Sequence, residues 1–218
     1  MQILDDEVTV RGSVQFVESS LLDLICSSLF SCTRIAIVNP LDELTRLTAL
    51  FPDSARLIKT VEHTPASTTP EPYRSLLVHD HHMTVTMEQH HGCSVNVSVL
   101  AADHSPPIYA RKIILTRSDD GRPVQFGIVR FNFEYVTPQV RDEILSGQIP
   151  LGRVLINHNV LRHIDLGAIL KIQAGAELAE LLEMPVEGVT YGRLATIFCN
   201  KRPAVDLLEV SAMLPSGD

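Results

Sequence analysis

The sequence predicts an α+β domain in which helices pack on a mainly antiparallel sheet. Hydrophobic residues make up 45% and charged residues 20% of the 218 residues, as in ordinary globular chains. The strand-like runs after residue 73 are joined by turn signals and hairpins instead of helical crossovers, which favours antiparallel pairing. We therefore predict one domain that spans residues 1–218.

The N-terminal region, residues 1–62, is expected to form a helical extension. Residues 19–29 begin with a serine cap and continue with apolar residues at helical spacing. Asn39 followed by Pro40 is typical of a helix start. Residues 63–73 are rich in Pro and Thr, which predicts a loop between the extension and the sheet.

Strand-like patterns follow this loop. The predicted strands are residues 83–88, 95–99, 109–116, 124–136, 161–172, 190–199 and 205–214. Two helices interrupt them. Thr137 and Pro138 start the first, which Gly147 ends, and residues 176–184 form the second, which stops at Pro185.

Two of the predicted hairpins share a short internal similarity. Tyr-Ala-Arg at 109–111 precedes Arg122-Pro123, and Tyr-Gly-Arg at 191–193 precedes Arg202-Pro203. Each unit is a strand, a polar turn, an Arg-Pro pair and a second strand. We interpret the two as related hairpins, each of which carries an arginine in its first strand.

Composition excludes several classes of function. Lys and Arg total 18 against 26 Asp and Glu, a net charge of −8, which argues against a nucleic-acid partner, as does the low aromatic content of 5%. The chain shows neither a signal peptide nor an apolar run long enough to span a membrane, which predicts a cytoplasmic protein. The cysteines form no CxxC pair, and nucleotide-binding glycine motifs are absent.

The histidines allow two interpretations. His79, His81 and His82 surround Asp80, and His90-His91 follow a few residues later. On a strand, His79 and His81 would share one face and could bind a metal ion. No third ligand follows at a recognisable spacing, so we expect polar residues at a strand end and no metal site.

Arg111 and Arg193 each lie in an apolar strand. An arginine cannot lose its charge, so a buried one must find an anion or several carbonyl groups. The partner could be a structural Asp or Glu, or the carboxylate of a small ligand. The residues alone leave both alternatives open.

Two further stretches could carry chemistry. Glu209 lies among Leu207, Leu208 and Val210, where a carboxylate would have a raised pKa or pair with a cation. It could equally be a charge at a strand edge. The segment 149–153, Ile-Pro-Leu-Gly-Arg, contains a glycine that would let the backbone approach a ligand and bind an anion through its N–H groups.

Together, these stretches resemble the chorismate pyruvate-lyase family, whose members form 4-hydroxybenzoate and pyruvate from chorismate. The resemblance covers about residues 74–214. The segments that carry it are Leu-Leu-Val-His-Asp-His-His-Met-Thr at 76–84, Tyr-Ala-Arg-Lys-Ile-Ile-Leu at 109–115, Asp-Gly-Arg-Pro at 120–123, Pro-Leu-Gly-Arg at 150–153, and the stretch from Arg202-Pro203 to Leu208-Glu209.

The resemblance implies a six-stranded antiparallel sheet that encloses a ligand beneath flaps, with no metal or organic cofactor. It implies that Arg111, helped by Arg193 or Arg153, binds the carboxylates of chorismate and that Glu209 assists proton movement as the catalytic acid or base. Met83, Leu151 and Gly152 would line the substrate site. The family has an arginine where this chain has Ile128, and Arg130 could substitute for it.

Two functions follow from the resemblance. The first is a lyase that releases pyruvate from chorismate. The second is a non-catalytic module of the same fold that binds an aromatic acid, as the effector domains of transcription regulators bind small molecules. Residues 1–60 do not resemble a helix-turn-helix domain. The oligomeric state and the hydroxybenzoate isomer do not follow from the sequence.

Overall fold

The computed structural model describes residues 39–52 and 56–215. The α-helices are α1 (Pro40–Thr48), α2 (Tyr73–Leu77), α3 (Met83–His91), α4 (Pro138–Ser146), α5 (Leu151–Asn157) and α6 (Ala176–Leu181). The strands are β1 (Ile58–Thr64), β2 (Val95–Ser105), β3 (Ile108–Arg117), β4 (Pro123–Asn132), β5 (Arg162–Ala174), β6 (Val189–Cys199) and β7 (Arg202–Ser211). Short 3₁₀ helices form at Ala66–Thr68 and Phe133–Tyr135.

The strands form one seven-stranded sheet in the order β1-β5-β6-β7-β4-β3-β2, and every neighbouring pair is antiparallel. The predicted α+β class is therefore confirmed, with one strand more than the six-stranded sheet that the family resemblance implies. The extra strand is β1, whose residues 58–62 were expected to be helical. Its burial does not alternate from residue to residue, so only its pairing with β5 marks it as a strand.

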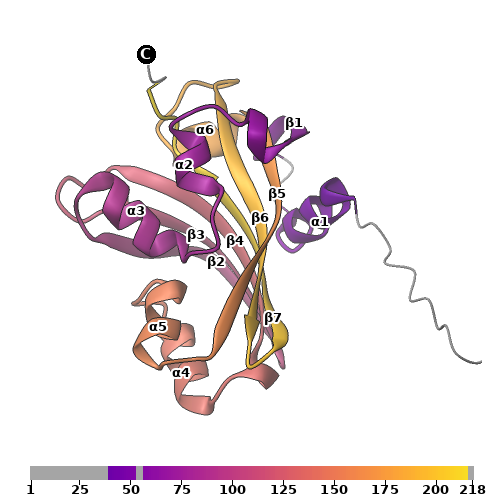
Figure 1. Cartoon of the computed structure of the whole chain (residues 1–218), viewed down its shortest axis with the longest axis vertical. Coiled ribbons are helices and arrows are strands. Elements are labelled where there is room, and N and C mark those ends of the chain that lie inside the picture. The colour runs from indigo at the N-terminus through magenta and orange to yellow at the C-terminus, as the bar shows by residue number, and fades with distance from the viewer. Residues whose placement is uncertain (1–38, 53–55, 216–218) are drawn as a thin grey trace, which may run out of the picture. The chain divides into compact units, whose positions relative to one another are not determined.

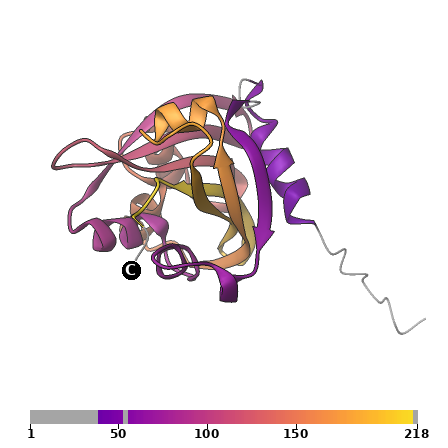
Figure 2. The same cartoon turned by 90° about the horizontal axis from the view of Figure 1, so that it is seen from above.

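Helices cover both faces of the sheet. On one face, which we call the outer face, α1 and α6 pack through leucines such as Leu47 and Leu178 onto Ile128 and Leu208. On the other, the inner face, α2 and α3 form one apolar cluster with β3 and β5, and α4 and α5 form another with β4, β6 and β7. Figure 1 shows α3 and α5 on the same side of the sheet, opposite α1, and Figure 2 shows how strongly the sheet curls.

Helix caps follow the predicted chemistry. The Asn39 side chain accepts a hydrogen bond from the Leu41 N–H at the start of α1. Thr137 caps α4 in the same way, and Gly147 ends that helix with a positive φ of 67°. Each cap satisfies backbone groups that have no partner inside the helix, which fixes where these helices begin and end.

Residues 83–88, predicted as a strand, instead begin helix α3. The buried residues of α3 are Met83, Thr84 and Met87, a spacing that places them on one side of a helix. Gly92 ends the helix in the left-handed conformation. The alternation of apolar and Thr residues suggested a strand, whereas packing of Met83 and Met87 against the inner face selects the helix.

The similarity between the two hairpins is structural. β3 and β4 form one hairpin, β6 and β7 form the other, and β4 pairs with β7 at the centre of the sheet. Ile128 pairs with Leu208, and both lie five residues after the proline of their Arg-Pro pair. A local two-fold axis that passes between β4 and β7 therefore relates the two hairpins.

Part of the sequence interpretation lies outside the described residues. This applies to the helix predicted at residues 19–29 and to Cys26 and Cys32. Cys93 and Cys199 are free cysteines. Within residues 39–52 and 56–215, no helix is long and apolar enough to cross a membrane.

Candidate functional site

A small, partly enclosed cavity lies on the inner face. Its volume is about 40 Å³, which holds about three water molecules. Strands β3, β4, β6 and β7 form its floor, and the first residues of α3 and α5 form its roof. Its polar lining residues are His82, Thr84, Arg111, Gln125, Arg193 and Glu209. The cavity thus collects Arg111, Arg193, Glu209, Met83, Leu151 and Gly152, which the sequence singled out separately.

Arg111 is buried without a carboxylate partner. It is 1% exposed, and its Nη1 donates to the Ile144 carbonyl near the end of α4 at 3.3 Å. Its Nε and Nη2 have no hydrogen-bond partner among the described residues. Burial lowers the pKa of this guanidinium, and the nearby Tyr109 hydroxyl partly offsets that effect. Arg111 therefore carries a charge with two free donors in the cavity wall.

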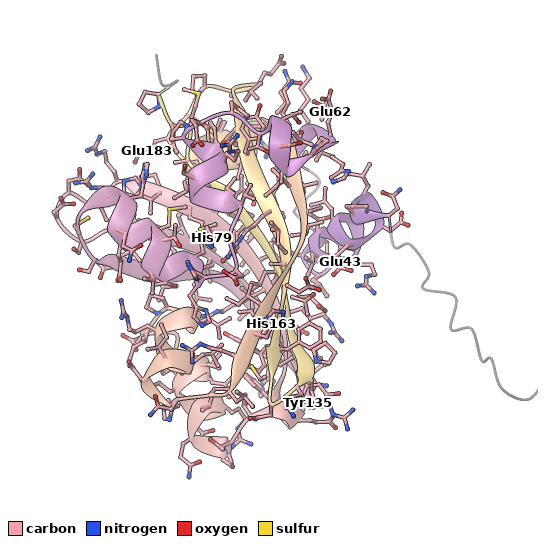
Figure 3. All side chains as sticks on the ribbon, viewed as in Figure 1. Glu43, Glu62, His79, Tyr135, His163 and Glu183 are labelled. Atoms are coloured by element: carbon pink, nitrogen blue, oxygen red, sulfur yellow. The ribbon has the colours of Figure 1, made fainter. Side chains whose placement is uncertain are left out.

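Arg193 is equally buried, but all three of its guanidinium nitrogens donate hydrogen bonds. It is 1% exposed, and its Nε donates to the Glu209 carboxylate at 2.7 Å. Its terminal nitrogens donate to the backbone carbonyls of His79 at 3.1 Å and His81 at 3.3 Å. His79, which is labelled in Figure 3, lies in the connection between α2 and α3. Arg193 therefore links this connection to the sheet.

Glu209 is held on two sides. Its Oε2 accepts the bond from Arg193, and its Oε1 accepts a 3.4 Å bond from the Nε2 of Gln125 on β4. The sequence interpretation of Glu209 did not include Gln125. Gln125 lies between Val124 and Phe126, and a buried polar residue in such an apolar strand is the signal that could have identified it.

Helices α3 and α5 approach each other above the cavity. Gly152, in the first turn of α5, would place a Cβ atom 3.1 Å from the Cβ of His82 and 3.1 Å from the Thr84 hydroxyl. Gly152 is thus required for contact between the two helices, a role that differs from the backbone approach to a ligand expected from the sequence. The first N–H groups of α3, at Met83 and Thr84, have no partner within the helix and lie at the cavity.

His82 separates the cavity from a wider surface pocket. It lines both spaces, and its Nε2 accepts a 2.6 Å hydrogen bond from the Nε of Arg162 on β5. Burial, together with the nearby charges of Arg162 and Arg193, lowers the pKa of His82 to about 4. His82 is therefore neutral at pH 7 and accepts the arginine bond. Its role did not emerge from the sequence, which grouped it with its neighbours as a polar run.

Other residues lie apart from the cavity. Arg153 of α5 pairs with Glu88 of α3 and does not line the cavity. Arg130 pairs with Asp206 at 3.3 Å, two residues along β4 from Ile128, whose side chain packs on the outer face. His79 and His81 lie in the α2–α3 connection and not on a strand, and the described residues hold no group of three potential metal ligands.

Comparisons with known proteins identify the fold only. No family model matches the sequence, and no curated protein matches it. The effector domain of PhnF from Mycobacterium smegmatis is 14% identical with a TM-score of 0.45. The match covers 61% of this chain and 88% of that effector domain. The ligand-binding domain of a putative GntR-family transcriptional regulator from Bordetella bronchiseptica is 11% identical with a TM-score of 0.43. The match covers 54% of this chain and 85% of that domain.

PhnF itself matches with 14% identity and a TM-score of 0.44 over 60% of this chain, and the chain spans 63% of the length of PhnF. The expectation of an enzyme is withdrawn, because these similar structures are named as a regulator, an effector domain and a ligand-binding domain, and none of the three is named as a lyase.

Proposed function

We propose that this domain is a non-catalytic module that binds a small organic acid in the inner-face cavity. The observation that carries the proposal is the buried guanidinium of Arg111, whose Nε and Nη2 have no partner among the described residues. A buried charge without a partner costs several kcal/mol, of order 3–5 where one member of a pair is missing. A bound anion would offset that cost.

The free donors of Arg111 favour a carboxylate. Nε and Nη2 lie on one edge of the guanidinium, and two parallel N–H groups match the two oxygens of a carboxylate. The structural alternative, a salt bridge to Asp or Glu, is found at Arg193 and not at Arg111 within residues 39–52 and 56–215.

The rest of the lining favours an apolar ligand body. Ile113, Leu115, Val129 and Leu207 form most of the cavity floor, so the ligand combines a carboxylate with an apolar part, as an aromatic acid does. The closed volume of about 40 Å³ is smaller than such an acid. Binding therefore requires the roof, made by the α2–α3 connection and α5, to move outward.

The remaining site residues take supporting roles in this proposal. Arg193 and Glu209 hold the α2–α3 connection and Gln125 in place, and Met83, Leu151 and Gly152 close the cavity. Neither a cofactor nor a nucleic acid is part of the proposed function. We further propose that the module acts in the cytoplasm, in keeping with the sequence prediction.

Isothermal titration calorimetry with benzoate and 4-hydroxybenzoate tests the proposal. We expect the parent to bind at least one of these acids, and Arg111→Met to weaken binding by about 30-fold or more, because charge-assisted pairs of this kind contribute about 2–5 kcal/mol. Arg130→Met, which removes an arginine from the outer face, is the matched control and should bind as the parent does. Equal affinity in Arg111→Met and the parent would contradict the proposal.

A further inference from the structure

Gln125 presents an unused hydrogen-bond acceptor to the cavity. The side chain is 2% exposed, and its Oε1 has no partner among the described residues. Its Nε2 donates to the Oε1 of Glu209 at 3.4 Å. A buried carbonyl oxygen without a donor is costly, about 1–3 kcal/mol, so its retention at a cavity wall indicates a partner that the protein itself does not supply.

The orientation of this amide is determined by its neighbours. Arg193 donates to one oxygen of Glu209, and the other oxygen accepts from Gln125. If the amide were turned over, its oxygen would face the carboxylate oxygen, and two acceptors would meet without a proton between them. The carboxylate therefore keeps the Nε2 of Gln125 on its own side and leaves Oε1 as an acceptor for another group.

Gln125 and Arg111 lie at opposite ends of the cavity floor. Arg111 pairs with Val129 on β4, so Gln125 is four residues further along that strand, a separation of about 13 Å. Gly127 lies midway between the two positions, and Ile113 pairs with it. Gly127 has no side chain, and the side chain of Ile113 fills the space beside it, because a Cβ atom at Gly127 would lie 3.2 Å from the Cγ1 of Ile113. The floor between the free donors of Arg111 and the free acceptor of Gln125 is therefore apolar.

We propose that Gln125 is a specificity-determining residue that selects acids with a hydrogen-bond donor, a hydroxyl or an amino group, at the end opposite the carboxylate. This inference rests on the proposed function, because it assumes that the carboxylate occupies Arg111. The apolar part of the ligand lies against Ile113, and its donor meets the Oε1 of Gln125. An acid without that donor leaves the amide oxygen unpaired.

Four probe acids of similar size test the inference by calorimetry: 4-hydroxybenzoate and 4-aminobenzoate, which carry a donor, and benzoate and 4-methoxybenzoate, which do not. We expect the parent to bind the donor-bearing acids about 5- to 50-fold more tightly, which is the effect of one buried unpaired acceptor. In Gln125→Leu and Gln125→Met this preference should shrink to less than about twofold. Gln89→Leu, at an exposed position on α3, is the control and should keep the preference.

The outcomes separate the two proposals. Binding of no probe, or binding that Arg111→Met leaves unchanged, overturns the proposed function and this inference with it. Arg111-dependent binding with equal affinity for 4-hydroxybenzoate and 4-methoxybenzoate overturns only the inference. A preference for the donor that persists in both Gln125 variants also overturns it, because another group must then accept the bond. Thermal unfolding of each variant shows whether it is folded. Gln125→Leu and Gln125→Met give two independent measurements of the preference, so the test does not depend on one variant.

Discussion

Arg111 and Arg193 occupy equivalent positions on the two related hairpins, but among the described residues only Arg193 faces a carboxylate. Arg111 pairs with Val129 and Arg193 with Glu209, and these partners lie six residues after Pro123 and Pro203, respectively. One arginine is thereby neutralised within the protein, and the other keeps free donors in a shared cavity. The difference between Val129 and Glu209 separates a structural arginine from the one that we propose to bind the ligand.

Arg111→Met should stabilise the ligand-free domain while it removes binding. The buried guanidinium has two donors without partners, so an apolar side chain of similar length relieves an unfavourable burial. We expect the free energy of unfolding to rise by about 1–3 kcal/mol, within the range seen when buried charges are replaced by apolar residues. Chemical denaturation followed by circular dichroism measures this change, and a loss of stability would show that Arg111 is structural.

Arg193→Met should have the opposite effect on stability. It leaves the Glu209 carboxylate buried without its cation and releases the α2–α3 connection, so we expect a loss of about 3–5 kcal/mol. The double variant Arg193→Met/Glu209→Met removes both charges and should recover a large part of that loss. A double-mutant cycle in denaturant measures the coupling, and additive losses would contradict the assignment of these two residues as a buried pair.

Much of the sheet could be predicted from the sequence, because hairpins have local signals. Alternation and turn residues located β3, β4, β6 and β7, and the repeated Arg-Pro pair located the two related arginines. The prediction failed for α3, where tertiary packing outweighs the alternation of residues 83–88, and for β1, which only its partner strand defines.

The sequence singled out residues that the structure brings together, but it did not predict the contacts between them. The sequence identified Arg111, Arg193 and Glu209, and the cavity brings them together. It could not show that Glu209 pairs with Arg193, since that depends on the register of the β6–β7 hairpin, which shifts between Ile197 and Phe198. The enzymatic interpretation relied on the resemblance of short motifs to a family, and a fold or a motif does not by itself determine function.

Arg153→Ala should leave ligand binding unchanged. Arg153 pairs with Glu88 at the surface of α3 and α5, and its side chain does not line the cavity. Exposed ion pairs of this kind contribute about 0.2–1 kcal/mol, so we expect a small loss of stability and an affinity for benzoate within about twofold of the parent. Calorimetry with Arg153→Ala decides the point. A loss of affinity comparable to that of Arg111→Met would place Arg153 at the carboxylate, as the family resemblance implied.

His82 should make the domain less stable in weak acid. Burial and the neighbouring arginines lower the pKa of His82 to about 4 in the folded state, whereas an unfolded histidine has a pKa of about 6.5. Between these values the unfolded chain binds more protons than the folded one, so stability rises with pH. The contribution is fully present above about pH 6.5 and is lost as the pH falls towards 4, by about 3 kcal/mol in total.

Denaturant unfolding of the parent and of His82→Gln at several values between pH 4 and pH 7 measures this contribution. Glutamine can still accept the hydrogen bond from Arg162 but does not titrate in this range, so the variant should lose about 3 kcal/mol less than the parent on acidification. His163→Gln, at an exposed position on β5, should follow the parent. If His82→Gln and the parent lose stability in parallel, His82 is not the group whose protonation destabilises the cavity roof.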